Sequence, residues 1–209
     1  MRRLLPSTRL ACTLALLLTA ALPSGHDAAA QAAAPKAEGV PAQDDARSVI
    51  PPELSDEARK AYAQGLREAR ELIARNDYKA AMARLDGLLA GRPREAQARF
   101  LKGIVQTSLG ETDAAIMTFR ALTEDYPELP EPYNNLAVLY AQKGDYNGAR
   151  AALETALAAA PDFAVARENL GDIYVRLAAA NYDRAAALDR SSKTVPAKLE
   201  LVRQLLAAK

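Results

Sequence analysis

Small, apolar and turn-forming positions recur along the chain with a fixed period. Pro93, Pro127 and Pro161 are 34 residues apart, and each lies 12 residues after an alanine and 10 residues before a glycine or alanine. Those small residues are Ala81, Ala115 and Ala149 on one side and Gly103, Ala137 and Gly171 on the other. A period of this length is typical of a unit made of a helix, a turn and a second helix. The pattern predicts an all-α solenoid with full repeats at about 62–95, 96–129 and 130–163.

The predicted turn inside each repeat has residues suited to ending one helix and starting the next. Gly110, Gly144 and Asn76 tolerate the left-handed conformation that ends a helix. Asp77 and Asp145 follow, where a carboxylate can cap the next helix. The three periodic prolines then end each second helix, because proline cannot continue the hydrogen-bond ladder. Two helices are therefore expected in every repeat.

A fourth unit starts in register near residue 164 but lacks about five residues of turn, so that Leu177 runs directly into three alanines. We expect residues 164–190 to form one long helix in place of a hairpin. Residues 196–208 have an amphipathic pattern, and we expect them to form a separate helix that covers the exposed end of the solenoid.

The first 30 residues have the pattern of a secretory signal peptide. Three arginines precede the apolar run Leu10–Leu22, and Ala28–Ala30 provides small residues for cleavage between Ala30 and Gln31. The apolar run is shorter than the roughly 20 residues that span a membrane. We expect an exported protein with no stable membrane span after cleavage, and a retained N-terminal anchor is the alternative.

Residues 31–52 are rich in alanine and proline and have no apolar period, so we predict a disordered linker. The solenoid domain is expected at 53–209. It should begin with Ser55 as the cap of a helix that has Asp56 and Glu57 in its first turn.

The composition limits the chemistry of the mature chain. Cys12 and His26 are the only cysteine and histidine, and both lie in the predicted signal peptide. Without residues 1–30 the chain has no thiol, imidazole or soft metal ligand, and its net charge is about −1. We therefore expect no catalytic residue, no metal, no cofactor and no nucleic-acid partner. Glu168 and Asp172 are four residues apart on one predicted helix, and we interpret them as surface acids.

The repeats resemble the tetratricopeptide repeat family. That family has a small residue at position 8 of each unit, alanine at position 20, a large residue at position 24 and proline at position 32. The large residues here are Leu85, Phe119 and Leu153, and the position-8 residues are Ala69, Gly103, Ala137 and Gly171. The resemblance implies that the two helices of each unit cross at position 8. It also implies a concave face, lined by the first helices, that holds partner peptides.

The first helix of the second repeat departs from the family pattern. Its usual core positions hold Arg99, Lys102 and Gln106. Its apolar residues lie elsewhere, at Phe100, Leu101, Ile104 and Val105. Either this helix is rolled relative to the pattern, or it exposes an apolar surface in the groove.

The family's ligand-holding positions assign eight candidate partner-binding residues to the concave face: Arg67, Arg70, Phe100, Ile104, Asn134, Asn135, Val138 and Asn169. A carboxamide can satisfy a peptide unit without reading its side chain, and arginine can pair with an acidic segment. The alternatives are that the asparagines are surface polar residues or cap local backbone, and that the apolar residues belong to the core. The arginines could equally be solvated.

The sequence therefore favours a non-enzymatic protein-interaction module that binds an extended peptide or a partner helix. It is similar to small exported tetratricopeptide repeat proteins of Proteobacteria, which implies a periplasmic location and a protein or peptide partner there. That resemblance also implies a role in envelope or cell-wall assembly. A self-associating scaffold, joined through the fused fourth unit or the final helix, is the alternative to a monomer. An enzyme, or an accessory subunit of one, is the third interpretation.

Overall fold

A computed structural model describes residues 55–207, and these form eight α-helices with no strand. The predicted signal peptide, its cleavage site and the predicted linker lie outside the described residues. The helices are α1 Asp56–Ala74, α2 Tyr78–Ala90, α3 Ala96–Ser108, α4 Thr112–Asp125, α5 Pro130–Gln142, α6 Tyr146–Ala159, α7 Ala164–Leu188 and α8 Val195–Ala207. The predicted all-α class is confirmed.

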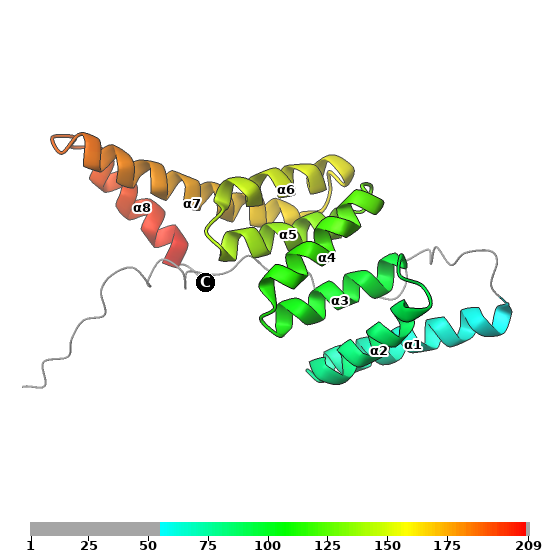
Figure 1. The fold of residues 1–209 in the computed structure, drawn as a ribbon. Helices are drawn as coiled ribbons and strands as arrows, with labels where there is room; N and C mark the ends of the chain where they lie inside the picture. Colours follow the sequence, from blue (N-terminus) through cyan, green and yellow to red (C-terminus); the bar gives the residue numbers. More distant parts are fainter. Residues whose placement is uncertain (1–54, 208–209) are drawn as a thin grey trace, which may run out of the picture.

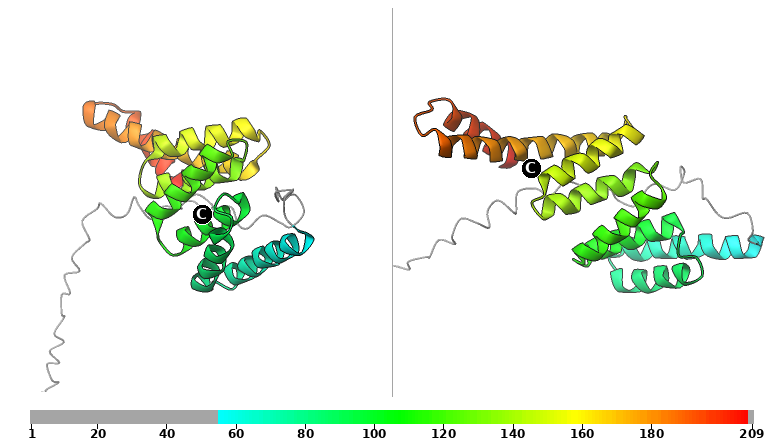
Figure 2. Two further views of the ribbon diagram at one scale, coloured as in Figure 1. Left: turned by 45° about the vertical axis from the view of Figure 1, so that its right-hand side comes forward. Right: turned by 45° about the horizontal axis from the view of Figure 1, so that its top comes forward.

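The first six helices form three hairpins that stack side by side (Figures 1 and 2). In each hairpin, α1–α2, α3–α4 or α5–α6, the two helices pack on each other, and the second helix also packs on the first helix of the next unit. First helices of adjacent units meet directly in the pairs α1–α3 and α5–α7. The arrangement is the predicted solenoid of three full repeats.

The turns and caps follow the predicted chemistry. Asn76, Gly110 and Gly144 have positive φ angles of 58°, 77° and 78°, so each ends its helix in the left-handed conformation. Asp77 Oδ1 accepts from the amide of Ala80 at 3.2 Å, and Asp145 Oδ1 accepts in the same way at 2.9 Å from the third residue beyond it. The Ser55 hydroxyl caps α1 as expected. The signals that end one helix and begin the next therefore lie within each turn.

Two apolar clusters make up the interior, and α3 contributes to both. Leu101 and Val105 belong to the cluster built from α1, α2 and α3. Phe100 and Ile104, on another side of α3, are half-buried against the larger cluster of α4 to α7. The Phe100 ring meets the fully buried Phe119 ring edge-on, with centroids 5.7 Å apart. The helix is therefore rolled relative to the family pattern, and both of its apolar sides are packed.

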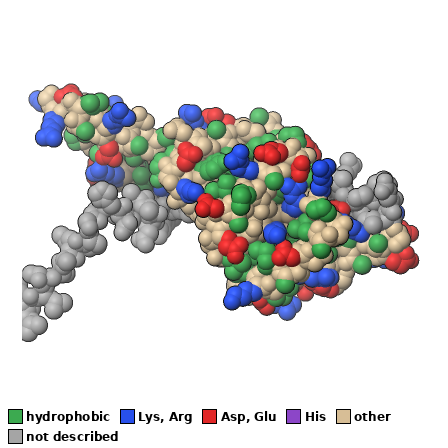
Figure 3. All heavy atoms as spheres, in the orientation of Figure 1, with side chains coloured by type: hydrophobic (Ala, Val, Ile, Leu, Met, Phe, Trp, Pro, Cys, Tyr) green, Lys and Arg blue, Asp and Glu red, His purple; other side chains and the backbone are tan. Residues whose placement is uncertain are grey.

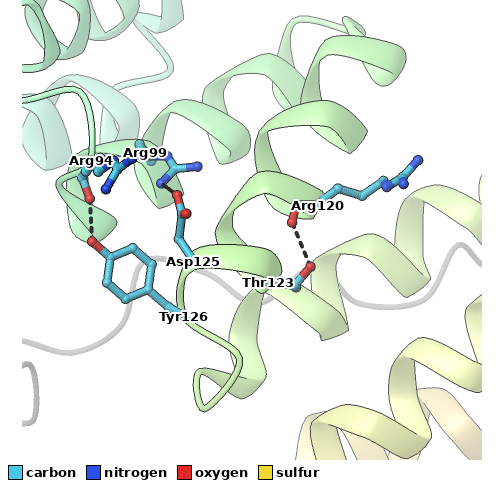
Figure 4. A network of polar contacts seen from close by, with 6 residues as sticks. All are labelled: Arg94, Arg99, Arg120, Thr123, Asp125 and Tyr126. Carbon is cyan, nitrogen blue, oxygen red and sulfur yellow. Dashed lines mark hydrogen bonds and ion pairs between the residues drawn. The ribbon is translucent and has the colours of Figure 1, made fainter.

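The roll gives the polar residues of α3 partners on the neighbouring helices. Arg99 pairs with Asp125 of α4 at 2.5 Å, close to the point where Tyr126 donates to the carbonyl of Arg94 (Figure 4). The other two residues behave alike: Lys102 pairs with Asp86 of α2 at 2.7 Å, and Gln106 Oε1 accepts from the Thr118 hydroxyl of α4 at 2.7 Å. Ion pairs and a hydrogen bond thus replace apolar contacts at the family's usual core positions.

The fourth unit is the single long helix α7, as predicted. Helix α8 packs on α7, and among the described residues it makes no comparable contact with any other helix. Arg203 of α8 pairs with Asp183 of α7 at 3.0 Å, and Lys198 Nζ lies 5.9 Å from the centre of the Tyr182 ring. The two helices project from the stacked hairpins (Figures 1 and 2).

The missing turn corrects two expectations in the fourth unit. Gly171 was expected at a crossing of two helices, but it is exposed, and a Cβ built on it would meet no atom within 4 Å. Tyr174 lies at a position that the resemblance to the tetratricopeptide repeat family places in the core, but it is 50% exposed. Both differences have one cause: α7 continues straight, so no second helix folds back over this face.

Candidate partner-binding surface

The two candidate arginines of α1 differ in exposure. Arg67 is exposed, and its Nη2 donates to the Gln64 side chain at 2.5 Å. Arg70 is half-buried, and its Nε is withdrawn from solvent with no hydrogen-bond partner among the described residues. Burial lowers the pKa of Arg70, because removing a charged group from water disfavours its charged form. Arg70 therefore retains unused hydrogen-bonding capacity.

The three candidate asparagines lie in the interior and not on an open surface. Asn134, Asn135 and Asn169 are 0%, 2% and 1% exposed. Asn135 Nδ2 donates to the carbonyl of Glu131 at 3.0 Å, which agrees with the alternative of a local backbone contact. This placement corrects the expectation of solvent-facing side chains. Their role in holding a partner stays a prediction.

A buried hydrogen bond between asparagines joins two repeats. Asn169 Nδ2 of α7 donates to Asn134 Oδ1 of α5 at 2.8 Å. The other donor of that amide pair, Asn134 Nδ2, is withdrawn from solvent and has no partner among the described residues. Buried polar groups are normally satisfied, so an unused buried donor is unusual.

The apolar candidate residues do not form an exposed apolar surface in the groove. Val138 is 2% exposed, whereas Phe100 and Ile104 are half-buried against the larger apolar cluster. For Phe100 and Ile104 the core interpretation agrees with this packing. The expectation of an apolar groove surface at Val138 is corrected, because its side chain is inaccessible in the structure.

The described surface mixes charges of both signs. The face in Figure 3 shows basic, acidic and apolar side chains interspersed over the solenoid. Within residues 55–207 no group of three or more acidic, histidine or cysteine side chains could hold a metal ion. In the same range no helix is both long and apolar enough to cross a membrane.

A cluster that the sequence did not reveal lies between α1 and the start of α3. Tyr62 and Arg70 come from α1, Arg92 from the α2–α3 connection, and Glu95 is the N-cap residue of α3. The Arg92 guanidinium lies 4.8 Å from the centre of the Tyr62 ring. No spacing rule links these four residues, because only the packing of α3 on α1 brings them together.

The four groups also influence one another's pKa values. Burial raises the pKa of Tyr62, the Glu95 charge raises it further, and Arg92 and Arg70 oppose both effects. Burial also raises the pKa of Glu95, although the Arg92 charge lowers it. We name Tyr62, Arg70, Arg92 and Glu95 the α3 entry cluster.

Comparison with known proteins agrees with the repeat structure. Two tetratricopeptide repeat models match the chain, one at residues 66–130 and one at residues 130–163. The chain is a tetratricopeptide repeat protein. The matched segments cover the three full repeats apart from the first residues of α1, and the fused helix α7 begins immediately after them.

Among curated proteins, this tetratricopeptide repeat protein is similar to tetratricopeptide repeat protein 8 of Homo sapiens, with 36% identity over 94 residues. The match covers 42% of this chain but only 17% of that relative. The similarity therefore concerns a group of repeats within a much longer protein.

Two solved structures show the same fold. A thermophilic tetratricopeptide repeat protein of Thermus thermophilus matches with a TM-score of 0.53 and 21% identity, covering 69% of this chain and 82% of that one. The Yersinia enterocolitica type III secretion chaperone SycD, in complex with a peptide of the translocator YopD, matches with a TM-score of 0.53 and 17% identity. That match covers 59% of this chain and 98% of SycD.

Proposed function

We propose that this tetratricopeptide repeat protein is a non-enzymatic interaction module that binds an extended segment or a helix of a partner protein along its first helices. The observation that carries the proposal is the unused buried donor Asn134 Nδ2 on α5. A buried donor without an acceptor costs about 1–3 kcal/mol, and a backbone carbonyl of a bound segment would remove that cost. Because Asn134 is fully buried, binding has to include a local rearrangement of the side chains above it.

The solved relatives support this type of function. SycD has the same fold and binds a peptide of YopD. At 17% identity the likeness concerns the fold, so the partner of this chain follows from its own residues. The α5–α7 contact with its asparagine pair is the part of this chain that offers hydrogen bonds suited to a peptide backbone.

Site-specific photocrosslinking in cells tests the proposal. Asp172 is exposed on α7 three residues after Asn169, and a photoreactive residue placed there should form partner adducts. The same probe at Met117, which is exposed on α4 of the second repeat, is the matched control and should form none of these adducts.

The Asn134→Ala variant then tests the role of the amide. Loss of one good hydrogen bond, about 1 kcal/mol, should reduce the adducts at position 172 about fivefold while circular dichroism shows a folded protein. Equal adduct yields in wild type and variant, or equal yields at positions 172 and 117, would contradict the proposal.

We also propose that the module works in the periplasm, where it would assist assembly of the envelope or cell wall. The support is the signal-peptide pattern of residues 1–30. Fusion of residues 1–54 to a reporter active only after export should give activity, and the mature protein should begin at Gln31 on N-terminal sequencing. An inactive fusion would contradict the location.

Self-association is the second candidate, and one observation favours it. Leu201 and Leu205 lie one helical turn apart on α8 and are each 61% exposed. Light scattering over a wide concentration range distinguishes the two candidates. A mass that stays at one chain supports the interaction module as a monomer, whereas a dimer that Leu201→Lys disrupts supports the scaffold.

A further inference from the structure

The amino end of α3 is the starting point, because its first turn has no side-chain cap. Its N-cap residue Glu95 makes no capping hydrogen bond, and the same holds at the amino ends of α4, α5 and α7. The first amides of a helix have no partner inside the helix and carry a partial positive charge. This end of α3 therefore attracts an anion.

A buried tyrosine points to the same place. Tyr62 is 5% exposed, and its hydroxyl is withdrawn from solvent with no hydrogen-bond partner among the described residues. The backbone amide of Ala98, in the first turn of α3, lies close enough to lower the pKa of Tyr62. The hydroxyl is thus a buried donor directed at the uncapped end of α3.

Two arginines add further donors beside that hydroxyl. Arg70 Nε and Arg92 Nη1 are also withdrawn from solvent and without a hydrogen-bond partner among the described residues. Both residues are half-buried, so the rest of each side chain reaches the surface. Glu95 Oε1 is likewise withdrawn from solvent without a partner, so three donors and one acceptor of the cluster are unpaired among the described residues.

The charge of the α3 entry cluster favours an anion. Two guanidinium groups and one carboxylate leave a side-chain charge of one positive unit, next to the positive end of the helix. This net positive charge attracts an anion, and the Glu95 carboxylate weakens the attraction. A carboxylate also has the two acceptor oxygens that an arginine and a hydroxyl can share.

We propose that the α3 entry cluster binds the side-chain carboxylate of an acidic residue in the partner segment, with Tyr62, Arg70 and Arg92 as donors. The proposal rests on the proposed function, because the carboxylate belongs to the partner protein. It adds a chemical requirement to that function: a partner segment that carries aspartate or glutamate at the α1–α3 end of the solenoid.

The test uses a small probe, so that it does not depend on the partner. N-acetylglutamate α-amide is titrated into the ¹⁵N-labelled protein, and N-acetylglutamine α-amide is the neutral control. The Nε–H resonances of Arg70 and Arg92 should shift with the acid and not with the amide. Arg75, which is exposed and paired with Glu71, should not shift. Equal responses to both probes, or no response to the acid, would overturn the proposal.

Two variants of the cluster should change affinity in opposite directions. Tyr62→Phe removes the buried donor but keeps the ring beneath Arg92, so the dissociation constant for the acid should rise about fivefold without loss of stability. Glu95→Gln removes the like charge, so the dissociation constant should fall by a similar factor. Arg75→Gln, at the exposed C-cap of α1, is the matched control and should have no effect. If the cluster only stabilised the fold, Glu95→Gln would not bind the acid more tightly than wild type. Unchanged or weaker binding in Glu95→Gln would therefore overturn the assignment.

The two proposals fail in different ways. Shifts at Arg70 and Arg92 without adducts at position 172 would remove the proposed groove but keep the carboxylate site. Adducts at position 172 without these shifts would keep the interaction module and reject the acidic requirement.

Discussion

Gly103 and Gly171 occupy the same position of two units, yet their surroundings are opposite. A Cβ on Gly103 would lie 2.6 Å from the ring of Phe119, which is fully buried and cannot move aside easily. A Cβ on Gly171 would meet nothing within 4 Å. The requirement for a small residue therefore comes from the second helix of the unit and is absent where that helix is missing.

This contrast predicts opposite effects of one substitution. Gly103→Ala should lower the free energy of unfolding by about 1–3 kcal/mol through overpacking. Gly171→Ala should raise it by about 0.5–1 kcal/mol, because alanine is the better residue in an open helix. Urea unfolding followed by circular dichroism measures both free energies. Two changes of the same sign would contradict the conclusion that no second helix packs over Gly171 in the fourth unit.

The asparagine pair gives a second prediction for single residues. Asn169→Ala removes the donor to Asn134 Oδ1 and leaves that buried acceptor unpaired, so the free energy of unfolding should fall by about 1–3 kcal/mol. Asn147→Ala, at an exposed position of α6, is the control and should change it by less than about 0.5 kcal/mol. If Asn169→Ala unfolds at the same urea concentration as wild type, the side chain is not buried as described.

Glu95 predicts a pH dependence with a definite sign. Burial raises its pKa, so its contribution to stability is fully present below the ordinary pKa of glutamate, near 4.3, and is lost as the pH rises through the higher folded value. Glu95→Gln should therefore gain stability relative to wild type on going from about pH 3.5 to pH 7. Urea midpoints at the two pH values measure the change. A constant difference between the proteins would show that burial does not perturb this carboxyl.

At the scale of elements, α3 shows how tertiary packing overrides a repeat pattern. Its apolar residues lie on two sides, toward the two clusters, and its polar residues reach helices α2 and α4. From the sequence, both a rolled helix and an exposed apolar face were consistent with this distribution. Only the positions of α2 and α4 decide between them, since they provide Asp86, Asp125 and Thr118 as partners.

The ion pairs of α3 should therefore matter more than an exposed pair. The Arg99 side chain is 12% exposed, so Asp125→Ala leaves a largely buried charge without its partner and should cost about 1–3 kcal/mol. Asp113→Ala breaks an ion pair with Lys143 in which the Asp113 side chain is 84% exposed and the Lys143 side chain 51% exposed. Its loss should lower the free energy of unfolding by less than about 0.5 kcal/mol. The comparison of urea midpoints checks the order, and equal costs would contradict the packing of α3.

On the scale of the whole molecule, the stability of the chain is expected to be uneven. Helices α5 and α6 bury many side chains, whereas α8 buries only Leu199 among its described residues. The continuation of α7 beyond Leu177 has no buried residue among the described ones. Segments with few buried apolar contacts open most easily.

Amide hydrogen exchange should reproduce this order. Amides of α5 and α6 are expected to be the slowest, and those of residues 178–207 the fastest in the described part of the chain. Deletion of residues 190–209 should leave the melting temperature of the hairpins nearly unchanged, because α8 packs on α7 alone. Strong protection of α8, or a large loss of stability on its removal, would show that it holds the solenoid together.

The sequence by itself determined the hairpins. Their lengths, turns and caps depend on residues close together in the chain, such as Asn76 and Asp77 at one turn, and the 34-residue period repeats those local signals. The small residues of helix crossings were predictable for the same reason wherever a complete hairpin exists. The fused helix α7 was also predictable, because a missing turn is a local feature.

The tertiary structure decided which side of each helix is buried and which side chains meet. Asn134 and Asn169 were placed on the correct helices, but their burial depends on how α5 packs against α7. The α3 entry cluster collects residues from two helices and a connection, and its chemistry exists only when α3 rests on α1. Whether a side chain is buried, and which side chains it meets, depends on contacts between distant segments of the chain. A repeat pattern predicts such contacts only where every unit has the same neighbours.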